Sequence, residues 1–330
     1  MGRVLSGIQP TGEIHIGNYI GAIRHWVSDQ WVNDSFFAVV DLHAITVPQD
    51  PETLRAKTLE VAAILLAAGI DPDRATLFVQ SQVHEHAELA WILNCFAMFG
   101  ELQRMTQFKD KAHKQEASGV SVGLFDYPVL QAADILIYRA DRVPIGEDQR
   151  QHLELTRDIA QRFNSRFGET FVLPEAAIPK EGAKIADLQN PTAKMSKSAD
   201  TGQGTLRVID RPDVLVRKIK TAVTDSGGEV LAREDKPAMS NLLTIFSVVA
   251  EVPVHELESR YEGKGYGDFK KDLAEAVVEF LRPLQQRTAE IMDDRAGLLR
   301  TLETGAAKAQ SVAAGTLAEV REKVGFLPRS

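Results

Sequence analysis

Hydrophobic and polar residues in the first 150 positions alternate between two patterns, one typical of buried strands and the other of helices. The segments 3–6, 36–40 and 76–80 are short and β-prone, and 36–40 is apolar throughout, as in a strand buried on both faces. Helical stretches are predicted at 17–28 and 54–68. Strands and helices that alternate at this spacing indicate a parallel sheet with right-handed crossovers.

The second of these helices carries clear boundary signals. Asp50 is a suitable N-cap, Pro51 stands at the first helical position, and Glu52 adds an acidic residue to the first turn. Gly69 follows the Ala- and Leu-rich stretch and ends it. We therefore expect a complete helix between the second and third strands.

Past about residue 205 the pattern becomes helical. An amphipathic helix is predicted by apolar residues that recur on one helical face, namely Leu273, Val277, Phe280, Leu281 and Leu284. Pro283 is expected to kink or interrupt that helix. A further Ala-rich helix is predicted at 306–324, closed by Gly325. Segment 190–204 is polar and lacks periodicity, which predicts a mobile loop.

Together these patterns predict the fold class α/β with two domains. We expect a Rossmann-like, doubly wound parallel sheet at residues 1–200, including the polar loop. A C-terminal α-helical domain is expected at 201–330, with its last helix packing back on the first domain. The length of 330 residues agrees with two domains of about 150 residues each.

The composition narrows the class of protein. Hydrophobic residues make up 44% and charged residues 25%, as in ordinary globular chains, and the formal net charge of −8 argues against a protein that coats nucleic acid non-specifically. The single cysteine, Cys95, cannot form an internal disulfide and is predicted to be a small core residue. The sequence shows no run of about 18 apolar residues and no signal peptide, so we expect a soluble cytoplasmic protein without membrane contact.

Several common motifs are absent or weak. The chain has no Gly-x-x-x-x-Gly-Lys-Ser/Thr phosphate loop, and the glycines at 263, 265 and 267 are predicted to form a turn between helices. His84 and His86 lack further ligands at suitable spacing, so we interpret them as surface or helix-start histidines. We therefore predict no metal site built from protein side chains.

Two segments carry much sharper signals. The first, 10–18, reads PTGEIHIGN and comes directly after the first strand at the start of a helix. A helix N-terminus offers unpaired N–H groups, Gly17 lets a ligand approach the backbone, and His15 and Asn18 can donate to phosphate oxygens. An ordinary capped turn between strand and helix is the alternative interpretation.

The second segment is KMSKS at 194–198, within the polar loop. Two lysines three residues apart, flanked by hydroxyl groups, can close over a triphosphate and neutralise the charge that develops on departing pyrophosphate. This pentapeptide occurs by chance in only about one chain in ten thousand of this length. A solvated run of charges is the alternative.

This pair of segments resembles the paired signature of class I aminoacyl-tRNA synthetases, with His15 to Asn18 standing for the usual H-I-G-H. Further segments resemble bacterial tryptophanyl-tRNA synthetase over nearly the whole chain: 6–12, 41–46, 105–111, 146–149 and 222–226. The resemblance implies ATP-dependent activation of L-tryptophan and its transfer to tRNA(Trp), by a homodimer with Mg²⁺ bridging phosphate oxygens. It also implies a nucleotide- and tryptophan-binding first domain and a second domain that binds the tRNA anticodon.

Three residues on one predicted helix could select the amino acid. Tyr127, Gln131 and Asp134 follow at i, i+4 and i+7, so they share one helical face. Asp134 supplies an acceptor for an indole N–H, which can only donate. Capping and packing residues of a core helix would give the same spacing.

Two positions depart from the family pattern. Bacterial tryptophan enzymes usually carry Met where this chain has Gln131, and Tyr-x-x-x-Gln-x-x-Asp resembles the helix that selects tyrosine in the sister enzyme. The other segments favour tryptophan, because the tyrosine enzymes usually carry K-F-G-K-S/T. Ala186 stands where the family more often has Met, which affects the detail of the adenine pocket.

The resemblance also implies the roles of individual residues. Catalytic roles fall to His15, Asn18, Lys111, Lys194 and Lys197. ATP is expected to contact Gln9, Thr11, Gly17, Asn18, Gly146, Asp148, Ile185, Lys194, Met195, Ser196 and Lys197. Tryptophan is expected to contact Leu5, Gly7, Val40, His43, Gln107, Tyr127, Gln131, Asp134, Ile145 and Gln149.

Three alternatives belong to other classes of activity. They are a tyrosine-specific synthetase, a small nucleotidyltransferase, and a synthetase-like paralogue with a regulatory role. A nucleotidyltransferase would lack the lysine loop and the helical tail, and a regulatory paralogue would have lost the phosphate-binding residues, whereas this chain retains both sets. Because the net charge is −8, tRNA is expected to bind through local basic strips: Arg104, Lys109, Lys111 and Lys114, or Arg207, Arg211, Arg217, Lys218 and Lys220.

Overall fold

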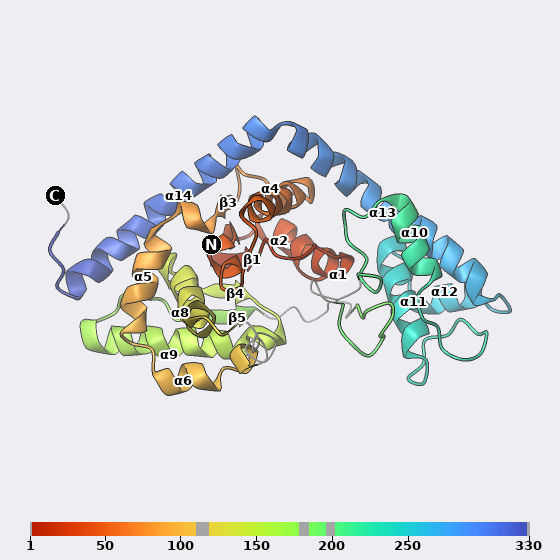
Figure 1. Ribbon diagram of the computed structural model, residues 1–330, viewed down its shortest axis with the longest axis horizontal. Coiled ribbons are helices and arrows are strands. Elements are labelled where there is room, and N and C mark those ends of the chain that lie inside the picture. The colour runs from red at the N-terminus through yellow and green to blue at the C-terminus, as the bar shows by residue number, and fades with distance from the viewer. Residues whose placement is uncertain (1, 110–118, 178–184, 196–201, 329–330) are drawn as a thin grey trace.

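The computed structural model describes residues 2–109, 119–177, 185–195 and 202–328 (Figure 1). Within these residues, five parallel strands form one sheet in the order β3-β2-β1-β4-β5. The strands are β1 (Arg3–Ile8), β2 (Asp34–Val39), β3 (Thr76–Val79), β4 (Arg142–Pro144) and β5 (Glu175–Ala177). This is the doubly wound order that the sequence predicts, with the three long strands close to their expected positions.

The sheet opens at the point where the strand order reverses. β1 pairs with β2 from Arg3↔Asp34 to Ile8↔Val39, but with β4 only at Val4↔Arg142. Beyond that single pair the two strands diverge toward their carboxyl ends. Ligands of doubly wound sheets bind in the crevice at such a switch point.

Helices cover both faces of the sheet. Residues that point to one face, such as Phe37 and Val39, pack with the helices that follow β1 and β2. Their neighbours Phe36 and Ala38 pack on the other face with the helices that precede and follow β4. In chain order, these elements are α1 (Ile16–Asn18), η1 (Tyr19–Ile23), α2 (Arg24–Asp29), α3 (Asp41–Ala44), α4 (Pro51–Ala67), η2 (Gln80–Gln82), α5 (Glu85–Asn94), α6 (Phe99–Arg104), α8 (Val122–Ile137), η3 (Glu147–Gln149) and α9 (Arg150–Phe167).

The boundary signals of α4 act as the sequence predicts. The Asp50 carboxylate accepts a hydrogen bond from the Thr53 N–H at 2.8 Å, and Pro51 is the first helical residue. Gly69 follows with a φ of +114°, a conformation that favours glycine. These contacts explain why α4 begins and ends where it does.

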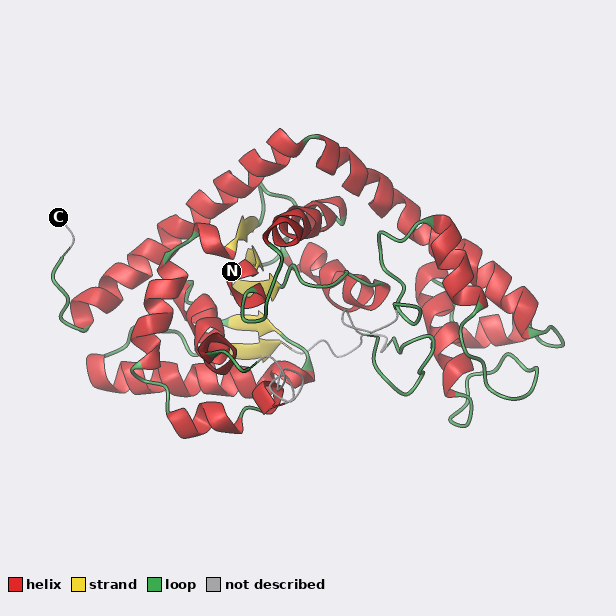
Figure 2. Ribbon diagram, viewed as in Figure 1, coloured by secondary structure: helices red, strands yellow, loops and turns green. Residues whose placement is uncertain are grey.

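The remainder of the chain is helical, and Figure 2 shows the strands confined to the other half of the molecule. Its helices are α10 (Pro212–Lys220), α11 (Pro237–Ala250), α12 (Val254–Arg260), α13 (Tyr266–Asp293) and α14 (Arg295–Lys323). The expectation that Pro283 interrupts its helix is wrong, because α13 runs through it. Pro283 is exposed, so water can satisfy the carbonyl that loses its partner, while Leu281 and Leu284 remain buried on the opposite face.

The last helix packs against the sheet half. α14 begins at Arg295, earlier than predicted, and contacts β3, α5 and α8. Gly305 allows the closest approach, because a Cβ there would lie 1.8 Å from the carbonyl oxygen of Leu77. Ion pairs from Arg139 to Glu319 and from Arg321 to Glu88 join α14 to α8 and α5. Gly325 follows with a φ of +85°.

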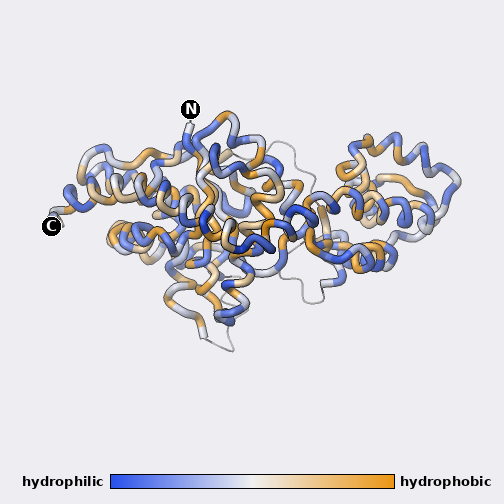
Figure 3. The backbone as a smooth tube through the Cα atoms, turned by 90° about the horizontal axis from the view of Figure 1, so that it is seen from above, coloured by the Kyte–Doolittle hydropathy of each residue, from blue (hydrophilic) through white to orange (hydrophobic). Residues whose placement is uncertain are grey.

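Hydropathy follows this packing, and Figure 3 shows hydrophilic and hydrophobic residues alternating along the helices. No single helix of the described residues has the length and apolar character needed to cross a membrane, although the bent pair α11 and α12 passes the same test jointly. Most of the apolar residues of α11 are buried in the core. The prediction that Cys95 is a core residue is wrong, because it caps the exposed C-terminal end of α5.

Candidate active site

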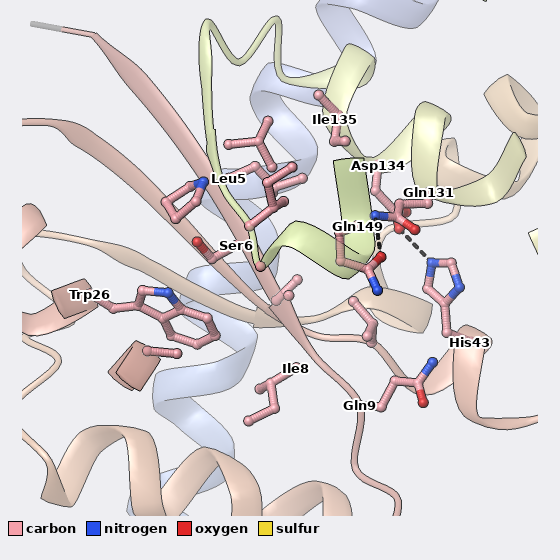
Figure 4. A pocket seen from close by; sticks show the side chains of 18 of the residues that line it. Leu5, Ser6, Ile8, Gln9, Trp26, His43, Gln131, Asp134, Ile135 and Gln149 are labelled. Carbon is pink, nitrogen blue, oxygen red and sulfur yellow. Dashed lines mark hydrogen bonds and ion pairs between the residues drawn. The ribbon is translucent and has the colours of Figure 1, made fainter. Parts of the chain in front are cut away.

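A cavity of about 450 Å³ lies at the switch point between β1 and β4 (Figure 4). It is lined by many of the residues that the sequence singles out, namely Leu5, Gly7, Gln9, Asn18, Val40, His43, Gln107, Tyr127, Gln131, Asp134, Ile145, Gly146, Asp148 and Gln149. Residues that sequence reasoning did not name complete the wall: Ser6, Ile8, Ala22, Ile23, Trp26, Ala38, Ile135, Val143 and Pro144. The other described candidates lie outside this lining: Thr11, His15, Gly17, Ile185, Lys194 and Met195.

The loop after β1 forms a compact cap on α1. The His15 Nδ1 atom accepts a hydrogen bond from the Asn18 N–H, and the Asn18 Oδ1 atom accepts one from the His15 N–H, both at 3.3 Å. His15 is 3% exposed, so its ring is part of the wall of this loop. A Cβ at Gly17 would lie 3.0 Å from two atoms of that ring, which leaves no room for a larger residue. Asn18, by contrast, faces the cavity.

The start of the lysine loop is joined by backbone contacts to the segment at 185–186. Lys194 pairs with Ala186 in an antiparallel bridge, and the Met195 N–H donates to the Ile185 carbonyl at 3.1 Å. Ile185 and Met195 are buried, whereas Lys194 is exposed. Lys111, Ser196 and Lys197 lie outside the described residues.

Asn241 of α11 holds the backbone at Ala186. Its side-chain oxygen accepts from the Ala186 N–H at 2.8 Å, and its side-chain nitrogen donates to the Ala186 carbonyl at 3.0 Å. Since both contacts are made to the backbone, the departure at position 186 does not disturb them. Sequence reasoning missed Asn241, because its partner is 55 residues away.

Amide and carboxylate side chains form the polar rim beside β4. Gln107 donates to the Asp148 carboxylate at 3.1 Å, and Gln149 donates to the same carboxylate at 2.9 Å. Gln131 reaches Gln149 at 3.4 Å (Figure 4). A Cβ at Gly146 would lie 2.6 Å from the Asp148 Oδ1 atom, so a larger residue there would displace this carboxylate. This arrangement presents a carboxylate and three amides to a ligand.

The next polar group along α8 is Tyr127. Its hydroxyl lies 3.0 Å from the His152 Nε2 atom and 3.4 Å from the Gln107 Oε1 atom. Burial raises the pKa of the Tyr127 phenol above its ordinary value, so the hydroxyl keeps its proton. It can therefore both donate and accept at the cavity wall.

Asp134 also lines the cavity and is 5% exposed. Its Oδ2 atom is 2.7 Å from the His43 Nε2 atom, and its Oδ1 atom is 2.7 Å from the Gln80 Nε2 atom and 2.6 Å from the His86 Nδ1 atom. Burial acts to raise the pKa of Asp134, but the positive potential of His43 and the hydrogen bonds from His43 and His86 outweigh it and lower the pKa below its usual range. The cavity therefore holds an ionised acceptor.

Residues 2–282 match the family of tRNA synthetases class I (W and Y). The chain is 59% identical over 328 residues to tryptophan–tRNA ligase 2 of Streptomyces avermitilis, covering 99% of this chain and 97% of the relative. It is 55% identical to the tryptophan–tRNA ligase of Caldanaerobacter subterraneus subsp. tengcongensis, with both chains covered in full. The chain belongs to the class I tryptophan–tRNA ligase family. It is therefore an enzyme, an aminoacyl-tRNA synthetase.

Solved structures of this family agree with the fold. The tryptophanyl-tRNA synthetase of Mycoplasma pneumoniae is 38% identical with a TM-score of 0.89, covering 99% of this chain and 98% of that one. The Campylobacter jejuni enzyme, complexed with ADP and tryptophan, is 38% identical with a TM-score of 0.86, covering 98% and 100%. A tyrosyl-tRNA synthetase from Aeropyrum pernix, 23% identical with a TM-score of 0.67 over 91% and 88%, shares the fold.

Within this synthetase, both histidines of the pair after β3 stand at the start of α5, as the sequence predicts. His84 is exposed, whereas His86 is fully buried and reaches Asp134 and Tyr138, contacts that the sequence did not indicate. Gln80, which also contacts Asp134, was not a candidate at all. The sequence does offer one signal for residues 80 and 86. Both follow the carboxyl end of a parallel strand, and the carboxyl ends of parallel strands lie at the same edge of the sheet, where ligands bind.

Proposed function

We propose that this chain activates L-tryptophan with ATP and then transfers it to tRNA(Trp). The observation that carries this proposal is the ionised Asp134 carboxylate in the wall of a cavity that also offers apolar side chains such as Leu5, Val40 and Ile135, an arrangement that suits an indole ring with its single N–H donor. The relatives above, named as tryptophan–tRNA ligases, support it. Gln131 is compatible with this role, because its amide points to Gln149 rather than to Asp134.

In the first step of the proposed reaction, the tryptophan carboxylate attacks the α-phosphorus of ATP and pyrophosphate leaves. In the second, the terminal ribose hydroxyl of the tRNA attacks the carbonyl carbon of the aminoacyl-adenylate, and AMP leaves. The protein acts by positioning the reactants and by stabilising charge. Asn18 and the cap formed with His15 offer donors to phosphate, and Asp148 accepts from the ribose.

The lysines supply the charge that the leaving pyrophosphate requires. Lys194 is exposed beside the buried Met195, so its ammonium group is free to turn toward phosphate oxygens. Lys111 and Lys197 are proposed to act with it, on the strength of the sequence alone. Ile185 and Met195 form an apolar surface next to Gly17, which suits the adenine ring.

Mg²⁺ is proposed to accompany ATP. The described residues contain no group of three or more His, Cys, Asp or Glu side chains that could hold a metal ion. Mg²⁺ usually keeps several waters and binds through substrate phosphates with few protein ligands, so the absence of a cage suits this ion. It would supply charge neutralisation at the phosphates.

The tRNA is proposed to bind chiefly through the helical half, with residues 1–200 as the catalytic domain and 201–330 as the domain that recognises the anticodon. Among the basic strips, Lys218 is ruled out as a contact, because it is buried and pairs with Asp210 at 2.6 Å. Arg217 and Lys220 of α10 are exposed and suit this role. Lys111 and Lys114 of the other strip lie outside the described residues.

A homodimer is supported by an apolar patch on α5 and α6. Trp91, Met98 and Phe99 are 72%, 52% and 67% exposed, and Cys95 lies among them. Clustered large apolar residues on a surface usually mark an interface. We propose that this patch joins two copies of the chain, and that the enzyme serves protein synthesis in the cytoplasm.

The decisive experiment is amino-acid-dependent exchange of pyrophosphate into ATP, run with tryptophan and tyrosine side by side. We expect exchange with tryptophan and a far lower kcat/KM with tyrosine, followed by charging of tRNA(Trp). A preference for tyrosine would show that the specificity is that of the sister enzyme. Binding of tryptophan without any exchange would instead favour a regulatory paralogue.

A further inference from the structure

Asp134 can act as an acceptor for a substrate only if its charge survives burial. An isolated carboxylate in an apolar wall becomes neutral, because the charged form loses its hydration. Here three side chains from three separate segments donate to it: His43, Gln80 and His86. Two of these donors, Gln80 and His86, are themselves fully buried. They are therefore internal supports rather than groups that the substrate can reach.

The Asp134 carboxylate keeps one acceptor position for a ligand. A carboxylate offers about four acceptor positions, two on each oxygen. The Oδ1 atom uses both of its positions, for Gln80 and His86, and the Oδ2 atom uses one, for His43. One position on Oδ2 remains, and Asp134 lines the cavity. The site is thus built to accept a single further N–H.

His86 has a defined protonation pattern in this arrangement. A carboxylate only accepts, so the Nδ1 atom of His86 carries the hydrogen that points to Asp134. In the neutral ring the Nε2 atom then accepts, and the Tyr138 hydroxyl lies 2.7 Å from it. Burial, with the negative charges of Asp134 and Glu85, raises the pKa of the Tyr138 phenol, so this hydroxyl retains the hydrogen that it donates.

Packing holds both rings in place. Tyr138 stacks on Phe36 with ring centroids 4.7 Å apart, and Phe78 meets Tyr138 edge-on at 5.7 Å. The His86 ring lies 5.9 Å from that of Phe78. All four side chains are buried, so their packing restricts the His86 ring to the orientation that meets Asp134.

We propose that His86, oriented by Tyr138, is a positioning residue that fixes the Asp134 carboxylate for recognition of the indole N–H. The inference rests on the proposed activation of tryptophan and adds the residues that make its selection possible. Neither His86 nor Tyr138 lines the cavity. Their effect on specificity is therefore transmitted entirely through Asp134.

The test compares tryptophan with β-(3-benzothienyl)alanine, in which sulfur replaces the indole N–H. The measured quantity is the ratio of kcat/KM values for the two substrates in pyrophosphate exchange. We expect His86→Leu to lower this ratio about tenfold, because a hydrogen bond to a charged group is lost. His86→Asn should keep the ratio within about threefold of the parent, since its side-chain N–H can replace Nδ1–H. Tyr138→Phe should give an intermediate value.

His84→Asn serves as the matched control, because this neighbouring histidine is exposed and makes no contact with Asp134 in the described structure. A purely structural role for His86 would lower kcat/KM equally for both substrates and leave the ratio unchanged, which would overturn the inference. If His86→Leu does not fold, Tyr138→Phe and His86→Asn still decide the matter, because an unchanged ratio in Tyr138→Phe would also overturn it. Failure of the parent enzyme to use tryptophan would instead refute the proposed function.

Discussion

Asp134 combines full burial, three donors and a remaining acceptor position, so a change of one atom type there should alter selection. Asp134→Asn removes the negative charge. It also replaces one acceptor oxygen by an amide N–H, which cannot accept the hydrogen bonds that the neighbouring side chains donate to Asp134. Hydrogen bonds to charged groups contribute about 1.5–3 kcal/mol, so kcat/KM for tryptophan should fall roughly tenfold to a hundredfold. Pyrophosphate exchange with tryptophan, tyrosine and phenylalanine measures this effect. Full discrimination retained in the variant would contradict the role of Asp134.

Lys197 is proposed to act only in the transition state, when negative charge develops on the departing pyrophosphate. Losing a donor aimed at such charge costs about 2.7–4 kcal/mol, so Lys197→Ala should lower the rate of activation about a hundredfold or more. Tryptophan affinity, measured by equilibrium binding, should stay nearly unchanged. Lys271→Ala is the control, because that lysine is exposed on α13 and does not line the cavity. Equal losses of rate and affinity would count against the assignment.

Among the elements, α14 depends on one glycine for its contact with the sheet. A Cβ at Gly305 would meet the Leu77 carbonyl oxygen at 1.8 Å, and this neighbour is backbone that cannot turn aside. Gly305→Ala should therefore destabilise the protein by roughly 1–3 kcal/mol, the range found for overpacked cores. Chemical denaturation monitored by circular dichroism measures the change.

Gly315 is the matched control on the same helix, because nothing lies within 4 Å of the place where its Cβ would be. Gly315→Ala should stabilise α14 by about 0.5–1 kcal/mol through helix propensity alone. Equal effects of the two substitutions would show that α14 does not press on β3 as described.

Sequence patterns predict the longer elements well because each carries its own signal. The segments that form β1, β2 and β3 contain short β-prone runs, and α4 has an N-cap, an early proline and a terminal glycine. β4 and β5 have only three residues each, too few for a periodicity to show. They form by pairing with strands that are distant in the sequence, β4 with β1 and β5 with β4, and this cause is tertiary.

The site is predictable to the extent that its residues lie in recognisable motifs. Tyr127, Gln131 and Asp134 share a helical face in the sequence, and the structure turns that face to the cavity. His86 and Gln80 are brought to Asp134 from 48 and 54 residues away, so no local pattern marks them. The prediction for Cys95 fails for a different reason. Cysteine as a residue type is usually buried, but Cys95 stands at an exposed position at the end of α5.

At the scale of the whole molecule, we expect the apolar patch of Trp91, Met98 and Phe99 to join two copies of the chain in a homodimer. Trp91→Lys should leave the melting temperature of the fold nearly unchanged, because the side chain is 72% exposed, while shifting a dimer toward monomer. Sedimentation velocity at micromolar concentration measures the change. Trp31→Lys is the control, since Trp31 is 54% exposed elsewhere and packs under Arg74. A parent protein that sediments as a monomer would refute the proposed interface.

The three donors to Asp134 also affect how the chain reaches its native state. They come from α3 and from residues 80–86, whereas the carboxylate comes from α8, so three distant stretches of the chain must dock before the charge is satisfied. A chain with only some of them in place would bury an ion with too few partners, at a cost of several kcal/mol. Partly assembled forms are thereby disfavoured, and the residues that select the amino acid also make unfolding of the sheet half more cooperative.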